Sequence, residues 1–389
     1  MKTSDPDETL WTSFPGSFRF TPSFPDEHSR YDVFTFKQHT GDYDYLKITG
    51  QYPHARYFSF TLYDEATSTD IAALTDTSIQ PDLGHDNPFF LDTSRSVEKR
   101  NYTIWLIKES IDPPKGAENI LYLPQEMQTI GLFYRLYRPD QGSDLKGNVP
   151  LPTIEAYKQD ISSGVLPESS LTPVSLAAKI QKLMFNQDLI STWDITKDFS
   201  KDSIRFYRIN DSGLYPSSDN EYIVASLTQN YHDKIAVITL TSPRYEHSFH
   251  GEEFTGDVDV RYWSLSVGGL GMTSTPDSIC DEETTVADDG KVTVLIAPNF
   301  LKNHLESQGY NVLHWGICYK PILIYRQMLA DASFSGNIKQ IPSINRPPAP
   351  EDQTQQYFDG HDAAVYIGEY CPTVELYSIS CFFQTQMNQ

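Results

Sequence analysis

The chain has 389 residues, beyond the roughly 250 to 300 at which one hydrophobic core stops growing, so we expect two domains. Its 52 acidic and 30 basic residues give a net charge of −22, which disfavours nucleic acid and anionic membrane surfaces as partners. The 24 tyrosines and 21 phenylalanines favour strands and aromatic-lined cavities over helical bundles.

The beginning of the chain and its cysteines bear on the compartment. Residues 1–10 are polar and acidic and lack the basic start and apolar core of a signal peptide, and no stretch reaches the ~18 apolar residues of a membrane helix. The four cysteines form no Cys-x-x-Cys pair and lie at Cys280, Cys318, Cys371 and Cys381. We therefore expect a cytoplasmic protein with free thiols and no membrane partner.

The chain is internally duplicated, with residues 24–138 echoed by residues 215–329. Phe24-Pro25-Asp26 matches Tyr215-Pro216-Ser217, and Arg135 matches Arg326, both at a spacing of 191 (215 − 24 and 326 − 135). The segments ARYFSF and VRYWSL, which start at residues 55 and 260, match at a spacing of 205 (260 − 55). The difference of about 14 residues is a loop insertion, a change that a preserved scaffold tolerates.

Alternating apolar and polar residues, bounded by turn residues, predict strands in both halves. In the first half they are expected at residues 45–49, 56–63, 102–108 and 130–137. In the second half they are expected at 222–227, 234–240, 261–267, 291–296 and 321–326, with a hairpin turn at Asp289-Gly290. These elements predict a mainly β fold of two similar antiparallel domains, each a β-sandwich or barrel-like domain of the jelly-roll type.

The segments between and after the repeats divide the chain. We assign residues 1–141 to the first β-domain, 142–200 to a linker, 201–344 to the second β-domain and 345–389 to a connector with C-terminal strands. Thr172 and Pro173 begin a helix predicted over residues 173–187 of the linker. The apolar residues 363–383 are expected to return as strands that close the sheet of either half.

Four segments resemble an uncharacterised family of bacterial proteins in which the types ARYFSF, DNPF, P-x-x-DN-x-Y and RYWS recur in this order. In this chain they are ARYFSFTLYD from residue 55, DNPF from residue 86, LYPSSDNEY from residue 214 and VRYWSLS from residue 260. The resemblance covers most of the chain, which is also similar to tandem jelly-roll domains of unknown function. It implies a fold and no established activity. Many such relatives are exported, and the missing signal departs from them.

Four arginines of the repeated strands fall in phase with apolar residues, at Arg56, Arg135, Arg261 and Arg326. An unpaired buried guanidinium would cost several kcal/mol, so each needs a carboxylate, a set of carbonyls or a ligand anion. One interpretation is a structural ion pair inside each half, with Asp64, Asp76 or Asp86 as the partner. The other is substrate binding, because the planar guanidinium suits a carboxylate or an enolate. We assign all four as candidate substrate-binding residues.

Three candidate catalytic residues lie outside the matched strands. Residues 80–89 (QPDLGHDNPF) have no clear equivalent in the second half, and there His85 would be a general base with Asp86 as its orienting partner. The alternative is a turn whose side chains bond their own backbone. His314, next to Trp315 and before Cys318 and Tyr319, is the third candidate because it could line a pocket. The alternative is a buried structural histidine.

Metal and cofactor motifs are weak or missing. The sequence H-x-x-H-x-E-E supplies enough ligands for zinc, at His247, His250, Glu252 and Glu253. Its spacing is not the helical H-E-x-x-H, and exposed loop histidines are common, so we assign no metal site. The chain also has no G-x-S-x-G elbow, Walker loop or G-x-G-x-x-G motif, and we expect no cofactor.

Two functions fit these observations. The first is a cofactor-independent enzyme of lyase, cyclase or condensing type in a natural-product pathway, acting on a small organic substrate that is aromatic or carries a carboxylate or carbonyl. Arg56, Arg135 and the His85-Asp86 loop would bind and polarise this substrate. The second is a non-catalytic small-molecule-binding or scaffold protein that uses the same cavity or the interface between the halves. The sequence does not separate the two and leaves the oligomeric state open.

Overall fold

The computed structural model describes most of the chain. The described residues are 10–16, 23–38, 43–167, 170–171, 173–175, 204–210, 215–227, 231, 233–269, 273–317, 321–345, 349–352 and 354–386. Most of the predicted helix at 173–187 lies outside these ranges, as do Cys318 and Tyr319. The described part is mainly β, as predicted, with its strands in four sheets.

The first half is a five-stranded sheet packed on a four-stranded sheet. The five-stranded sheet has the order β1 (Thr12–Pro15), β2 (Ser29–Lys37), β8 (Thr129–Pro139), β4 (Ala55–Asp64) and β5 (Thr69–Thr75). The four-stranded sheet has the order β7 (Ile120–Leu123), β6 (Asn101–Lys108), β3 (Tyr45–Gln51) and β9 (Thr153–Tyr157). All neighbouring strands are antiparallel except β6 and β7, which are parallel.

The second half repeats this arrangement strand by strand. Its five-stranded sheet has the order β10 (Tyr207–Arg208), β11 (Asn220–Ser226), β17 (Pro321–Met328), β13 (Tyr262–Gly269) and β14 (Ser274–Cys280). Its four-stranded sheet has the order β16 (Asn311–His314), β15 (Lys291–Ala297), β12 (Lys234–Thr241) and β18 (Thr373–Ser378), again with one parallel pair, β15 and β16. The register is also repeated, because Ser59 lies opposite Arg135 and Ser264 opposite Arg326. The predicted duplication is therefore confirmed.

Each half buries one core between its two sheets. In the first half the even-numbered apolar residues of β2, β4 and β8 pack against the four-stranded sheet, and this core includes Phe34, Phe36, Phe58, Phe60, Leu62, Leu132, Ile48 and Ile104. A matching core in the second half includes Ala225, Ile238, Val294, Trp263, Leu265, Leu323 and Tyr325. No sheet of the described residues closes into a barrel, so the sandwich form of the prediction applies and the barrel-like form does not.

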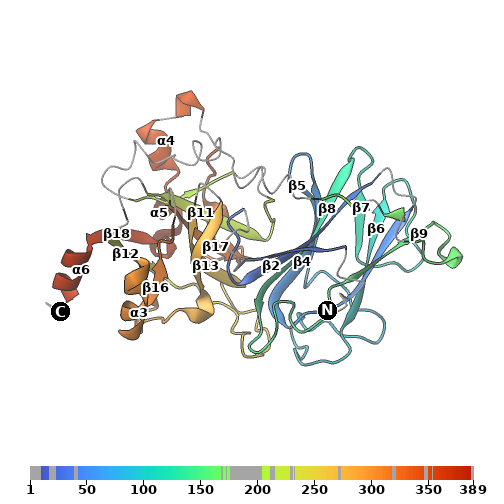
Figure 1. Cartoon of the computed structure of the whole chain (residues 1–389), viewed down its shortest axis with the longest axis horizontal. Helices are drawn as coiled ribbons and strands as arrows, with labels where there is room; N and C mark the ends of the chain where they lie inside the picture. The colour runs from blue at the N-terminus through green and yellow to red at the C-terminus, as the bar shows by residue number, and fades with distance from the viewer. Residues whose placement is uncertain are drawn as a thin grey trace.

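The two five-stranded sheets turn their other faces toward each other. Tyr57 and Tyr137 of the first half pack with Tyr262, Cys280 and Met328 of the second. In Figure 1, β2, β4 and β8 lie beside β11, β13 and β17 in the middle of the molecule. The four-stranded sheets lie farther out, with β6, β7 and β9 on one side and β12, β16 and β18 on the other. The interface between the halves is thus a buried layer in addition to the two cores.

Two strands of the described residues, β9 and β18, lie outside the ranges assigned to the β-domains. β9 falls within the predicted linker, and it pairs with β3 of the first half. β18 falls within the C-terminal segment, and it pairs with β12, so this segment completes the second half. The domain boundaries themselves stay predictions.

Short helices join and flank the strands of the described ranges. They are η2 (Ile161–Ser163), η4 (Asp281–Glu283), α3 (Asn299–Ser307), η5 (Ile338–Gln340), η6 (Pro350–Asp352), α4 (Gln355–Gly360), α5 (Ala363–Ile367), η7 (Gly368–Tyr370) and α6 (Ile379–Gln386). None of these helices has both the length and the hydropathy that a bilayer crossing requires.

A pair of matched asparagines allows a test of the equivalence of the halves. The Asn119 amide donates to the carbonyls of Gln80 and Thr103 at 2.8 Å each, and its oxygen accepts the Gln80 N–H at 2.7 Å. Asn311 makes the same three bonds with Thr285 and Thr293. Both asparagines therefore fasten the loop after an edge strand to the four-stranded sheet.

Asn119→Ala and Asn311→Ala should each lower the free energy of unfolding by about 1 to 2 kcal/mol, because each leaves the same three backbone groups without a partner. Urea denaturation measures this, with Asn303→Ala on the exposed face of α3 as a control that should cost nothing. A cost at one asparagine and none at the other would contradict the equivalence.

Candidate functional site

The side chain of Arg56, a residue of the first half, contacts residues of the second half. This side chain is fully buried, and it donates from Nη1 to Asp281 Oδ1 at 2.5 Å, from Nη2 to Glu282, and from Nε to Ser248 Oγ at 3.0 Å. Asp281 is also fully buried and accepts the Trp263 N–H at 2.9 Å. The partner that Arg56 requires is therefore a carboxylate of the opposite half.

Arg261 makes the reciprocal pair. Its Nη1 lies 3.3 Å from Asp76 Oδ2 and donates to the Arg56 carbonyl at 3.3 Å. The two pairs match at one spacing, because 261 − 56 and 281 − 76 both equal 205. Asp76 directly follows β5 and Asp281 directly follows β14. The halves thus meet as the two subunits of a symmetric dimer would, with each half supplying one arginine and one carboxylate.

Arg135 and Arg326 form a second reciprocal set. Arg135 donates to the Tyr215 carbonyl at 3.0 Å, and Arg326 donates to the Phe24 carbonyl at 3.1 Å. Phe24 and Tyr215 are matched residues, and both have positive φ, 50° and 56°. Two non-glycine residues in the left-handed region signal strain that the surrounding contacts maintain. In this backbone conformation each carbonyl accepts a hydrogen bond from an arginine of the other half.

The second set differs in charge. Arg326 also donates to Asp26 Oδ2 at 2.6 Å, whereas the residue that matches Asp26 is Ser217. Within the described residues, Arg135 bonds the hydroxyls of Tyr63 at 2.6 Å and Thr61 at 3.1 Å and has no carboxylate partner. Its guanidinium also lies over the rings of Tyr31, Tyr63 and Phe133.

The predicted ion pairs inside each half are therefore corrected. Arg56, Arg261 and Arg326 pair with carboxylates of the opposite half, and neither Asp64 nor Asp86 is a partner of any of them. Of the three carboxylates proposed, Asp76 does pair with an arginine, but with Arg261. The substrate-binding role of the four arginines stays a prediction.

Two carboxylates of the reciprocal sets, Asp76 and Asp26, differ in the direction of their pKa shifts. Burial raises the pKa of Asp76 to about 6, because the Arg261 guanidinium offsets only part of the cost. Burial acts in the same direction on Asp26, but hydrogen bonds and charges from His28 and Arg326 outweigh it and hold its pKa well below the usual range. Asp26 thus stays ionised as the partner of Arg326, whereas Asp76, the partner of Arg261, takes up a proton more readily.

The three candidate catalytic residues are not brought together. His85 Nδ1 accepts the Asn101 N–H at 3.0 Å in the first half, and no hydrogen bond of the described residues joins it to Asp86. His314 lies in the second half, where its N–H donates to Asp277 at 2.8 Å and its ring lies 3.7 Å from that carboxylate. A shared active site of these three residues has no support in these contacts.

The loop of His85 is held by Asn87. The Asn87 amide donates to the carbonyls of Asp76 and Ile79 at 2.7 and 2.9 Å, and its oxygen accepts the Phe89 N–H. The loop of residues 80–89 therefore stabilises the loop after β5, whose Asp76 pairs with Arg261.

The H-x-x-H-x-E-E ligands also lie apart. His250 Nδ1 contacts Gln141 Oε1 at 2.7 Å, while His247 is 68% exposed and lies 3.7 Å from Glu282. Among the described residues, these four side chains form no cluster with metal-binding spacing.

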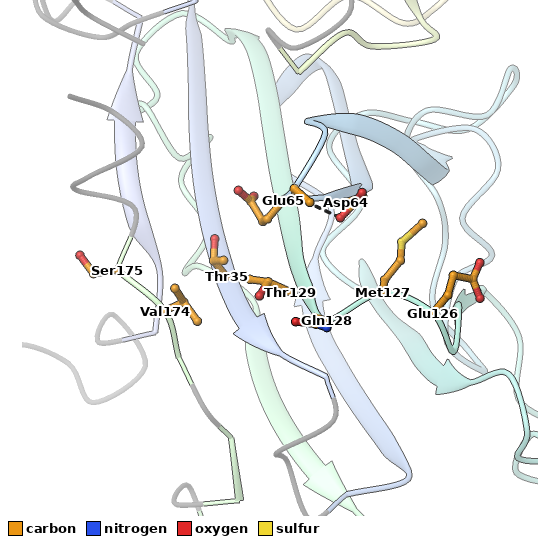
Figure 2. Close-up of a pocket in the computed structure, with 10 residues that line it drawn as sticks. Thr35, Asp64, Glu65, Glu126, Met127, Gln128, Thr129, Val174 and Ser175 are labelled. Carbon is orange, nitrogen blue, oxygen red and sulfur yellow. Dashed lines mark hydrogen bonds between the residues drawn. The ribbon is translucent and has the colours of Figure 1, made fainter. Parts of the chain in front are cut away.

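A cavity of about 700 Å³ lies at one end of the first half's five-stranded sheet, on the face that Arg135 shares. Figure 2 shows Thr35, Glu65 and Thr129 on this face, with Met127 toward one end and Val174 toward the other. The lining residues that the structure describes are Thr35, Asp64, Glu65, Ala66, Glu126, Met127, Gln128, Thr129, Val174 and Ser175. These described residues include three carboxylates and no lysine, arginine or histidine.

Glu65 is held in place from two sides. Its Oε2 accepts the Tyr215 hydroxyl at 2.8 Å, and a Cβ at Gly131 would collide with its Oε1. Gly131 is therefore the strand glycine that lets a carboxylate lie on the sheet. Tyr215 is also the residue whose carbonyl receives Arg135, so one tyrosine links the cavity to the interface.

No pattern in the sequence predicted this cavity. Glu65 directly follows the repeated strand β4. The position that matches it in the second half, residue 270, lies outside the described residues. The available signal was Gly131 within an otherwise apolar strand, because such a glycine often marks a close approach of another group.

Replacing one partner of the Arg56 pair should be more costly than replacing both. Arg56→Met should cost about 3 to 5 kcal/mol, because it leaves Asp281 buried without a counter-charge. The double variant Arg56→Met/Asp281→Asn should recover a large part of this, since the new amide oxygen can still accept the Trp263 N–H. Arg244→Ala at an exposed pair is the control and should cost under about 1 kcal/mol. Additive costs in a urea-denaturation cycle would rule out the coupling.

Asp76 should make stability depend on pH. Its folded pKa of about 6 exceeds the ordinary 3.8, so its protonation stabilises the fold at low pH and this contribution is lost as pH rises through 6. The loss is on the order of 3 kcal/mol at about 1.4 kcal/mol per pKa unit. The wild type should therefore lose stability relative to Asp76→Asn between about pH 4 and pH 7. A difference that moves in the opposite direction would mean that Arg261 keeps Asp76 fully ionised.

Comparison with known proteins gives a fold and no family. No protein-family model and no curated protein matches the chain. Among solved structures, an uncharacterised protein from Burkholderia cenocepacia is similar with a TM-score of 0.55 at 12% identity, over 96% of this chain and 84% of that one. The VPA0106 protein from Vibrio parahaemolyticus has a TM-score of 0.45 at 9% identity, over 82% of this chain and 88% of that one. The first likeness supports the architecture alone, and the jelly-roll description and the shared segments stay predictions.

Proposed function

We propose that the protein binds a small organic cation in the cavity lined by Glu65. The supporting observation is the lining itself, which places the carboxylates of Asp64, Glu65 and Glu126 around about 700 Å³ without a basic residue among the described lining. A volume of this size suits a small organic ligand. An ammonium or guanidinium group on that ligand would pair with the carboxylates.

Glu65 is the carboxylate on which the proposal places the ligand's charge. It is partly buried, and Tyr215 and Gly131 fix its orientation before a ligand arrives. A carboxylate that is already oriented loses less conformational entropy on binding than a free surface side chain does. The net charge of −22 would also raise the local concentration of cations.

Binding without catalysis is the alternative that these contacts favour over the lyase or cyclase hypothesis. His85, His314 and the four arginines are absent from the described lining, and Arg56, Arg261 and Arg326 are already engaged with protein carboxylates. A lyase or cyclase at this cavity would have to take its base from the carboxylates of the described lining, Asp64, Glu65 and Glu126. Of these, Glu65 is already engaged, because its Oε2 accepts the Tyr215 hydroxyl at 2.8 Å.

Ligand binding by wild-type protein and a Glu65→Gln variant tests the proposal. Agmatine, spermidine and tyramine should raise the melting temperature of the wild type, and benzoate should not. Glu65→Gln should weaken cation binding by about 10- to 100-fold, the loss of one charge-assisted hydrogen bond of roughly 1.5 to 3 kcal/mol. Isothermal titration calorimetry measures the dissociation constants.

Glu109→Gln is the matched control, because Glu109 is exposed and outside the cavity lining. It should bind each cation as the wild type does. Equal weakening in Glu109→Gln would indicate a general charge effect, and binding of benzoate with the same affinity as the amines would overturn the proposed ligand class.

A further inference from the structure

A cluster of three potential metal ligands lies where the halves meet, far in sequence from the histidines of the inserted loop. His28 comes from the turn before β2, Cys280 is the last residue of β14, and Glu283 ends η4. Their ligand atoms all lie within 4.8 Å of one another. His28 belongs to the first half and the other two to the second, so the cluster exists only when the halves are docked.

The histidine is oriented as metal-binding histidines are. Its Nδ1 lies 3.0 Å from Asp26 Oδ1, and its Nε2 lies 2.8 Å from Glu283 Oε1. A carboxylate on one ring nitrogen fixes the ring and makes the other nitrogen a better ligand. Asp26 is held in turn by Arg326 and Tyr262, so the supporting side chains are themselves positioned.

The cysteine and the glutamate hold each other. The Cys280 thiol accepts the Glu283 N–H, and the Glu283 carboxylate accepts the Cys280 N–H at 3.4 Å. Cys280 is fully buried, whereas His28 and Glu283 are partly accessible, at 14% and 37%. An ion could therefore approach from the side of Glu283.

The cluster is not part of the repeated frame. The positions that match His28, Cys280 and Glu283 are Asp219 (28 + 191), Thr75 (280 − 205) and Ser78 (283 − 205). The duplicated interface is thus formed at the matched place without a histidine, a cysteine or a glutamate. Docking at the matched place therefore does not require these three residue types.

We propose that His28 Nε2, Cys280 Sγ and Glu283 Oε1 bind one divalent cation of the zinc class across the two halves. One nitrogen, one sulfur and one carboxylate oxygen suit zinc, which takes mixed sets of these ligands and leaves a fourth position for water. The inference is independent of the cation-binding cavity at Glu65 and goes beyond that proposed function.

A neighbouring cation bears on the affinity. Arg138 donates to Glu283 Oε1 at 3.0 Å and would share that carboxylate with the ion. A cysteine and a histidine bind a metal ion as the thiolate and the neutral ring, so the affinity of the site should depend on pH.

Cobalt is the probe, because Co²⁺ accepts the same ligands and a Co²⁺–thiolate bond has a charge-transfer absorption. Metal-free wild-type protein should bind one equivalent of Co²⁺ with this band, and Zn²⁺ should remove it. Cys280→Ser should lose the band, and His28→Ala should weaken binding by more than the about 10- to 100-fold that loss of a supporting residue costs.

Cys371→Ser is the matched control, because Cys371 is also a buried free thiol of the second half. It should keep the band, and so should Cys318→Ser and the exposed Cys381→Ser. A band that persists in Cys280→Ser, or is lost in any of the three controls, would overturn the proposal. Should Cys280→Ser fail to fold, Glu283→Gln and the Zn²⁺-dependent rise in the wild-type melting temperature decide the matter, and no rise would also overturn it.

Discussion

The ion pairs that cross between the halves are the constraint on which the rest of the fold depends. Arg56 is fully buried, and its counter-charges, Asp281 and Glu282, come from the opposite half. A buried guanidinium without a partner is several kcal/mol less stable than a paired one, so neither half can bury its arginine alone. The reciprocal pair of Arg261 with Asp76 imposes the same requirement on the second half. The halves are therefore interdependent, although each has a core of its own.

Matched residues of the two halves have a structural role, whereas the candidate binding residues are found where the two halves differ. The matched arginines, tyrosines and carboxylates hold the halves together, and a ligand at those positions would have to displace a protein partner. The unmatched positions are not required at both of the matched places of the interface. Ser217 in place of a second Asp26 leaves Arg135 with hydroxyls and a carbonyl, and the His28 cluster and the Glu65 cavity likewise lack equivalents that the structure describes. New chemistry is more easily added at such positions, because the matched contacts still dock the halves.

Sequence patterns predicted the strands better than they predicted how the two halves pack against each other. The nine strands predicted within the two repeats exist, because alternation reports one buried face of a strand. Residues 363–383 were also predicted to form strands, and this was wrong in part, because only β18 is a strand there and α5, η7 and α6 flank it. The strand β14 was missed because Pro276 and Asp277 interrupt any alternation. Arg135 was placed on an apolar face, and that face is indeed buried, but against the other half and not in its own core. Periodicity shows that a face is buried and cannot show against what, so the partners of the arginines and the cavity could not be derived.

The four segments on which the predicted resemblance rests have identifiable contacts in the structure. ARYFSF and VRYWSL supply Arg56 and Arg261, and their neighbours Tyr57 and Tyr262 donate to Asp219 and Asp26 of the opposite halves at 2.5 and 2.8 Å. The DNPF segment contributes Asn87, which holds the loop of Asp76, and LYPSSDNEY contains Asp219. Each segment thus serves the docking of two similar sandwiches. A sequence that shares them is expected to share this interface, while its ligand depends on side chains that the segments do not include.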